Sequence, residues 1–178
     1  MAPQARVAIL KGSARQVFAE RGYSSSGLAE IAERAAVSKT LLYHYFPKGR
    51  PEIMAAVMDG LLADLTAATA EAVGVPAGAE DRIRAWVEAF LAFFVDQPDA
   101  FRLLFREPWG SGDPLVTIRS FRAMVELSRQ LAEPLGLHGA APSAQGVAAA
   151  DFVIGGLSRL RPPAPGGPGD RSRRPPHS

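Results

Sequence analysis

The sequence predicts an all-α protein. Apolar residues recur at three- and four-residue spacing in one segment after another, which is typical of helices that bury one face. Glycine and proline separate these segments, where they end helices. No alternation of apolar and polar residues, the pattern of a half-buried strand, extends over a useful length. We expect helices over residues 4–20, 39–45, 51–73, 79–96, 99–106, 115–133 and 143–160, with a further short one from residue 28 to a turn at 35–38.

The first expected helix presents one apolar face, formed by Val7, Leu10, Ala14, Val17 and Phe18. Glycine at position 22 suits the left-handed backbone at a helix end, and residues 24–26 are serines that can cap the next helix. That next helix carries a short apolar stripe of Leu28, Ile31, Ala32 and Ala35. Residues 4–35 therefore predict two helices that pack through apolar faces.

The turn at residues 35–38 leads into a second short helix. Ser38 is a good N-cap for it, and Pro47 ends it. Leu42 and either Tyr45 or Phe46 should face inward. The outer surface then holds Lys39, Thr40, Tyr43 and His44, which are groups suited to phosphates and base edges. Lys48 should lie beside the positive end of the next helix, which Pro51 begins.

The later helices predict a second core. The helix over 51–73 is apolar on more than one side, as expected of a connector that touches two cores. Residues 107–114 contain two prolines and two glycines and predict a loop. In the helix over 115–133 we expect Ile118, Phe121, Met124, Val125 and Leu131 to face inward. The last helix, 143–160, is rich in alanine, and residues 161–178, with six prolines and three glycines, predict a disordered basic tail.

The net charge of +2 is unevenly distributed. Residues 1–50 hold eight basic and three acidic side chains, whereas residues 51–160 hold eight basic and fourteen acidic ones. This pattern suits a phosphate-binding module joined to a part that does not bind nucleic acid, and it also suits an ordinary solvated surface.

Several classes of function have little support. The chain has no cysteine and three widely separated histidines, so we expect no disulfide, metal site or cofactor. No run of about eighteen uncharged apolar residues and no secretory signal is present, so we expect a cytoplasmic protein without a membrane partner. The sequence contains no nucleophile elbow, and no serine, histidine and acidic residue are grouped in it, so we do not expect an enzyme.

Three motifs resemble a known family. FAERGY at residues 18–23, EIAERAAVSK at 30–39 and LYHYFPK at 42–48 are similar, in the same order, to TetR-type (TetR/AcrR-like) transcriptional repressors. The resemblance implies a three-helix DNA-binding head with a helix-turn-helix at residues 1–50. It also implies a helical ligand-binding and dimerisation domain at 51–160, followed by the tail at 161–178. The implied function is a ligand-responsive regulator, a repressor, that binds a palindromic double-stranded operator as a homodimer and is released by a small hydrophobic effector.

The resemblance also implies roles for individual residues. Ser38, Lys39, Thr40 and Leu41 would face the groove of the DNA. Tyr43, His44 and Lys48 would contact phosphates, and Ser26 would anchor the first helix of the motif on the DNA backbone. The candidate effector site consists of large side chains from the second half of the chain. As single residues they would by default be part of the core: Trp86, Phe90, Phe94, Phe101, Phe105, Trp109, Phe121 and Met124. Four arginines, at positions 102, 106, 119 and 122, would either hold an acidic ligand group or be solvated or ion-paired.

The chain departs from the family pattern at several positions. Ala36 stands where the family has glycine in the turn, Gly27 replaces a hydroxyl near a helix cap, and Leu41 replaces a small polar residue. Only one helix is expected before the tail, where the family has two, so the last helix of the fold is apparently missing. Either this chain dimerises through fewer helices than the family does, or its tail comes from an altered or truncated end of the reading frame. We therefore expect weak dimerisation. The alternative function is a helical protein-interaction module with impaired DNA binding.

Overall fold

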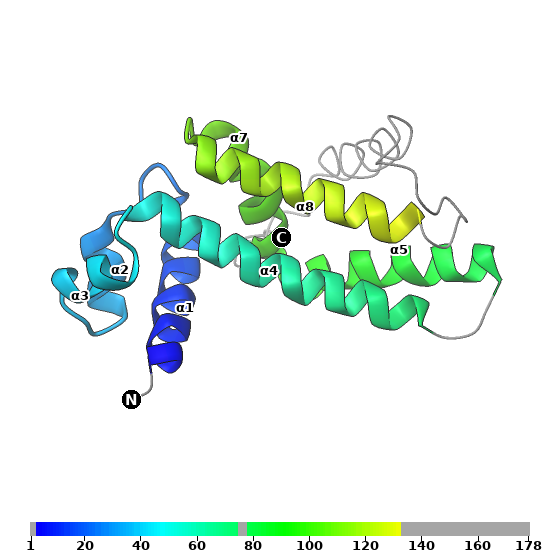
Figure 1. Cartoon of the computed structure of the whole chain (residues 1–178), viewed down its shortest axis with the longest axis horizontal. Helices are drawn as coiled ribbons and strands as arrows, with labels where there is room; N and C mark the ends of the chain where they lie inside the picture. The colour runs from blue at the N-terminus through cyan, green and yellow to red at the C-terminus, as the bar shows by residue number, and fades with distance from the viewer. Residues whose placement is uncertain (1–2, 75–77, 133–178) are drawn as a thin grey trace, which may run out of the picture.

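The computed structural model describes residues 3–74 and 78–132, and all the regular secondary structure in these residues is helical (Figure 1). The all-α prediction is confirmed for this part of the chain. The elements in order are α1 (Pro3–Arg21), α2 (Leu28–Arg34), α3 (Lys39–Tyr45), α4 (Arg50–Val73), α5 (Ala79–Asp96), α6 (Pro98–Phe101), the π-helix η1 (Arg102–Arg106), α7 (Glu107–Gly110) and α8 (Pro114–Ala132). The expected helix over 143–160 and the tail over 161–178 lie outside the described residues.

Helices α1 to α3 form a small group at one end of the molecule, which we call the head (Figure 1). The apolar stripe expected on α1 is buried, since Leu10, Ala14, Val17 and Phe18 are fully enclosed. Gly22 follows α1 with φ +79°, and its N–H bonds the carbonyl oxygen of Phe18 at 2.9 Å. Glycine takes this left-handed backbone without strain, so the end of α1 is fixed by its sequence.

Helix α4 joins the head to the other helices. It crosses the molecule and packs against α1, α5 and α8 (Figure 1). Its buried residues lie on more than one side, as expected of a connector: Ile53, Met54, Ala55, Val57, Met58, Leu61, Leu65 and Thr69. The helix is long and apolar enough to cross a membrane, with a mean hydropathy of 1.4, but helices in the core of a protein share this property. Asp59 on α4 forms an ion pair with Arg119 of α8 at 3.0 Å, which fits a core helix with a charged outer edge.

The segment after α5 differs from its prediction. We expected a helix over 99–106 and a loop over 107–114, but the chain stays helical to Gly110 through α6, η1 and α7. The loop prediction was wrong because Pro108 lies in the first turn of α7, a position where helices tolerate proline. Only residues 111–113 separate α7 from α8.

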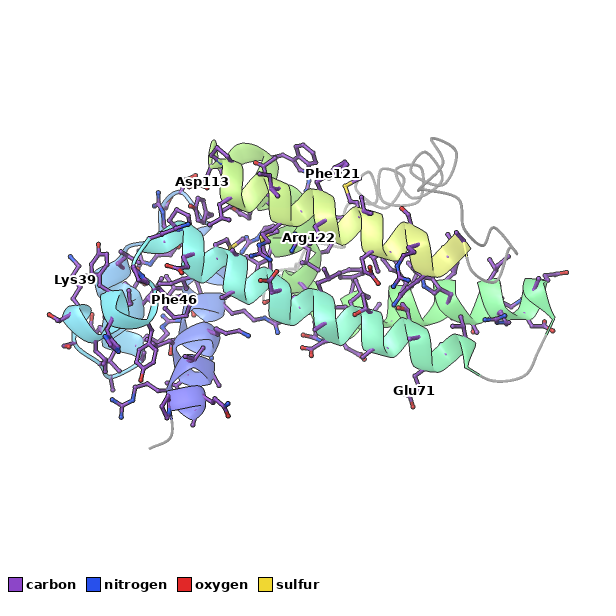
Figure 2. All side chains as sticks on the ribbon, in the orientation of Figure 1. Lys39, Phe46, Glu71, Asp113, Phe121 and Arg122 are labelled. Carbon is purple, nitrogen blue, oxygen red and sulfur yellow. The ribbon has the colours of Figure 1, made fainter. Side chains whose placement is uncertain are left out.

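Helix α8 buries a different face from the one expected. Ile118 and Phe121 are 60% and 54% exposed, so their inward assignment was wrong. Figure 2 shows Phe121 pointing away from α4. The buried residues of α8 include Ser120 and Ala123, which are small and allow α8 to approach its neighbours closely. Close packing therefore favoured the face with small residues over the one with the largest apolar side chains.

Candidate nucleic-acid interface

Helix α3 is positioned by one cap and two apolar anchors. The Oγ of Ser38 accepts a hydrogen bond from the N–H of Leu41 at 3.1 Å, so the predicted N-cap is confirmed. Leu42 is fully buried and Phe46 is 5% exposed, and both belong to the core shared with α1 and α4. In Figure 2, Phe46 points into the head while Lys39 projects from its outer end. These anchors leave one side of α3 facing away from the core.

The turn between α2 and α3 is a Schellman motif. The N–H of Ala36 bonds the carbonyl of Glu33 at 3.0 Å, and the N–H of Val37 bonds that of Ala32 at 2.9 Å. Ala36 has φ +52°, a left-handed backbone that glycine normally occupies in this motif. The turn thus keeps the expected geometry despite alanine, at a conformational cost of about 1–2 kcal/mol.

The structure brings most of the predicted contact residues onto one exposed surface of the head, which we call the α3 face. Its exposed members are Ser38, Lys39, Thr40, Tyr43, His44 and Lys48. Leu41 is half-buried beside them. The ring of His44 packs edge-on against Tyr45 at 5.2 Å between centroids. Lysine, hydroxyl and aromatic groups therefore occur together at the start and along the outer side of α3, where they can bind phosphates and base edges.

Ser26 does not belong to the α3 face. It is 3% exposed, and its hydroxyl donates to the carbonyl oxygens of Gly22 at 2.5 Å and Val17 at 3.4 Å. A hydroxyl that is hydrogen-bonded inward in this way cannot reach a phosphate. The prediction that the Ser26 hydroxyl anchors the helix on the DNA backbone is therefore wrong. Ser26 instead ties the loop before α2 to the end of α1.

Arg50 is a residue of the head that the sequence reasoning missed. Its guanidinium lies 4.7 Å from the ring centroid of Tyr23 and donates to the carbonyls of Ser24 at 3.0 Å and Ser26 at 3.2 Å. Arg50 therefore fastens the loop between α1 and α2 to the start of α4. Only the basic character of residues 48–50 signalled it, because its partners lie 24 or more positions earlier in the chain.

Ion pairs reduce the number of cations that the head can offer. Arg21 pairs with Glu30 at 2.6 Å, and Arg34 pairs with Glu20 at 2.5 Å. The hydrogen bond from Arg34 holds the pKa of Glu20 below its ordinary value. Among the residues that the structure describes, no such ion pair is formed by Lys39 or Lys48. Lys39 and Lys48 are thus available to bind a polyanion.

The aromatic residues of the candidate effector site divide into two groups. Phe94 is at the centre of a cluster in which the rings of Phe90, Phe101 and Phe105 lie 5.0, 5.4 and 6.2 Å away. Trp86 stacks on Phe90 at 5.0 Å. We call these five residues the aromatic cluster. The Nε1 of Trp86 is buried without a hydrogen-bond partner among the described residues, which leaves a donor unused inside an apolar region.

Two of the predicted effector residues lie elsewhere. Trp109 on α7 is 59% exposed and Phe121 on α8 is 54% exposed, so neither joins the aromatic cluster. Met124 packs at the edge of the core, half-buried. Of the four arginines, Arg102 pairs with Glu107 and Arg119 pairs with Asp59. These two arginines are therefore ion-paired, which was one of the two expected roles.

Comparisons with known proteins agree with this architecture. Residues 10–57 match the family described as "Bacterial regulatory proteins, tetR family". The HTH-type transcriptional activator FasR of Mycolicibacterium smegmatis is 35% identical over 97 residues, which are 54% of this chain and 44% of that protein. The match thus spans less than half of that relative's length.

Solved structures share the fold. The TetR family regulator PfmR from Thermus thermophilus superposes with a TM-score of 0.64 at 23% identity, covering 86% of this chain and 84% of its own. FadR from Bacillus halodurans, a fatty acid degradation regulator, gives 0.68 at 15% identity, with 88% and 81% covered. FadR from Bacillus subtilis, solved in complex with stearoyl-CoA, gives 0.66 at 17% identity, with 83% and 81% covered. Residues 10–57 are thus similar to the tetR family of bacterial regulatory proteins, and the chain shares the fold of solved tetR-family regulators.

Proposed function

We propose that the protein is a one-component transcription regulator that binds a palindromic operator as a homodimer through the α3 face. The observation that carries this proposal is the exposed set of Lys39, Thr40 and Tyr43 on a helix anchored in the core, with exposed Lys48 shortly after that helix. Two copies of α3 would enter successive major grooves about 34–36 Å apart. Residues 1–50 would then form the DNA-binding domain and residues 51–160 the regulatory and dimerisation domain. The protein would act in the cytoplasm, where DNA is accessible.

We further propose that a small effector with an apolar chain releases the protein from DNA by binding at the aromatic cluster. Aromatic side chains around one unused donor, the Nε1 of Trp86, suit a ligand with an apolar body and one acceptor. The Bacillus subtilis FadR structure holds stearoyl-CoA, which makes long-chain acyl-CoA the first class to test. Such a ligand acts only through its difference in affinity between the DNA-binding and released conformations.

The direct test is selection of operators from random double-stranded DNA with the purified full chain. We expect a palindromic sequence, and an affinity that falls as salt is raised. Native mass spectrometry with added stearoyl-CoA reports effector binding, and a reporter gene decides between repression, which the sequence resemblance implies, and activation, for which FasR is named. Recovery of no preferred sequence, with weak binding to all DNA, would contradict the proposal.

The alternative from another class is a helical protein-interaction module whose head no longer binds DNA. Ala36 and Gly27 motivate it, since both depart from the family pattern, although the turn at Ala36 keeps its hydrogen bonds. The selection separates the two functions. Light scattering at micromolar concentration tests the expected weak dimerisation, because a mass of one stable dimer would contradict it.

A further inference from the structure

Two side chains from a distant part of the chain hold the end of α1. The Nη2 of Arg102 donates to the carbonyl oxygens of Phe18, at 3.1 Å, and of Ala19. The Oε2 of Glu107 accepts a hydrogen bond from the backbone N–H of Tyr23 at 2.9 Å. A cation at the carbonyl end of a helix and a carboxylate on a backbone N–H are both favourable arrangements. The last turn of α1 thus has a charged partner on each side of the point where the helix ends.

The carboxylate of Glu107 lies close to the backbone of α1, and two ion pairs strengthen this contact region. A Cβ built on Gly22 would lie 3.3 Å from Oε1 of Glu107, so glycine lets the carboxylate approach the backbone. The Nε of Arg102 lies 3.6 Å from that Oε1, which makes the two side chains an ion pair. One turn earlier, Arg15 of α1 donates two hydrogen bonds to Asp99 of α6, at 2.7 and 2.8 Å. The head therefore meets the segment 99–107 through several charged contacts.

The π-helix η1 explains how Arg102 and Glu107 reach the same place. The N–H of Glu107 bonds the carbonyl oxygen of Arg102, the i to i+5 pattern of a π-turn. In an α-helix, residues five apart point about 140° away from each other, because each turn holds 3.6 residues. The wider π-turn brings both side chains to the side that faces α1. A regular helix with the same sequence would present only one of them there.

Pro108 accounts for the wide turn. In an α-helix its ring would clash with the carbonyl group of Leu104, four residues earlier, and it has no N–H to bond that carbonyl. The hydroxyl of Ser120 on α8 donates to the Leu104 oxygen at 2.7 Å and replaces the missing hydrogen bond. Both features stabilise the π register of η1.

We propose that Arg102 and Glu107 are positioning residues for the head, and that the π register maintained by Pro108 is what places them together on the end of α1. The head is held at a fixed position relative to α6–α7, next to the aromatic cluster to which Phe101 and Phe105 belong. The contacts of Arg102 and Glu107 with α1 do not depend on the proposed function, but their effect on operator binding rests on it.

The first test measures amide hydrogen exchange in the full chain. In Glu107→Ala the Tyr23 N–H loses its acceptor, so exchange in residues 18–27 should quicken about tenfold or more. Glu107→Gln retains an oxygen that can accept this hydrogen bond, and it should restore most of the protection. Exchange in residues 38–46 should not change in either variant, because the hydrogen bond and the ion pair of Glu107 join it to Tyr23 and Arg102 and not to α3. Unchanged protection at residues 18–27 in Glu107→Ala would overturn the proposal.

The second test addresses the register. Pro108→Ala restores the N–H and removes the clash, so η1 can become a regular helix and exchange in residues 18–27 should quicken as in Glu107→Ala. Pro98→Ala is the matched control, since Pro98 is exposed at the start of α6, outside the π-turn. The control should behave as the wild type. If Pro108→Ala and Pro98→Ala gave the same exchange, the role of the register would be wrong.

The third test uses the operator that the selection yields. Glu107→Ala should weaken operator binding about three- to tenfold while the slope of affinity against salt stays unchanged, because a carboxylate neutralises no phosphate. A change in that slope, or an unchanged affinity, would contradict the positioning role. If no operator is found, the proposed function fails, whereas the exchange experiments still decide whether the contacts hold the head.

Discussion

Replacing Ala36 with glycine should stabilise the protein. Ala36 has φ +52°, and alanine in this left-handed backbone is disfavoured by about 1–2 kcal/mol. Glycine removes this strain, but it loses more backbone conformational entropy on folding than alanine does, which costs about 0.5–1 kcal/mol. Ala36 is exposed, and both hydrogen bonds of the turn come from the backbone, so no contact is lost. The expected net gain in the free energy of unfolding is about 0.5–1 kcal/mol.

Thermal and urea unfolding of the full chain measure this gain. For a protein of this size the melting temperature should rise by about 1–4 °C, with an unchanged dependence on urea. Ala67→Gly is the matched control: Ala67 is also exposed but lies within α4, where glycine should lower stability by about 1 kcal/mol. If Ala36→Gly destabilised the protein as Ala67→Gly does, the strain assigned to the turn would be refuted.

Three further predictions concern the α3 face and the contacts of the head. Lys48→Ala should weaken binding to all DNA sequences and reduce the salt slope by about one, whereas Thr40→Ala should change the preferred sequence; equal losses on every sequence would contradict both roles. The hydrogen bonds from Arg15 hold the pKa of Asp99 below its ordinary value, so this carboxylate stabilises the fold above that value and less as pH falls through its native pKa. Asp99→Asn should therefore lower the urea midpoint at pH 7 and lower it less as the pH falls below the ordinary pKa of an aspartate, and an effect independent of pH would contradict the assignment. Gly49→Ala should destabilise the protein by more than about 1 kcal/mol in urea unfolding, since φ is +68° and the added Cβ would lie 3.2 Å from a leucine methyl group; wild-type stability would contradict this.

The geometry of α3 could be predicted from the sequence because it depends on neighbouring residues. Ser38 caps the helix three residues away, and Leu42 and Phe46 repeat at helical spacing and are buried. Once these residues face inward, the outer position of Thr40 and His44 follows from the helical period, because each lies two residues from Leu42. The exposed side of the candidate site therefore follows from local spacing alone.

Other parts of the site depend on contacts between distant residues. Whether Ser26 faces DNA or the core is decided by Val17 and Gly22, which accept its hydroxyl hydrogen. The choice of buried face on α8 depended on how closely the helices pack, which apolar spacing alone does not reveal. Long-range partners of this kind have no periodic signal in the sequence.

The sequence by itself determined the long helices, the cap of α3 and the residues exposed on the α3 face, because these follow from spacing and chemistry within one or two helical turns. The tertiary structure alone decided which side chains hold the head in place. Arg102 and Glu107 meet α1 across about eighty residues of chain, through a π-turn that Pro108 stabilises. Such contacts form only when separate helices pack together, because only then does each charged side chain reach its partner.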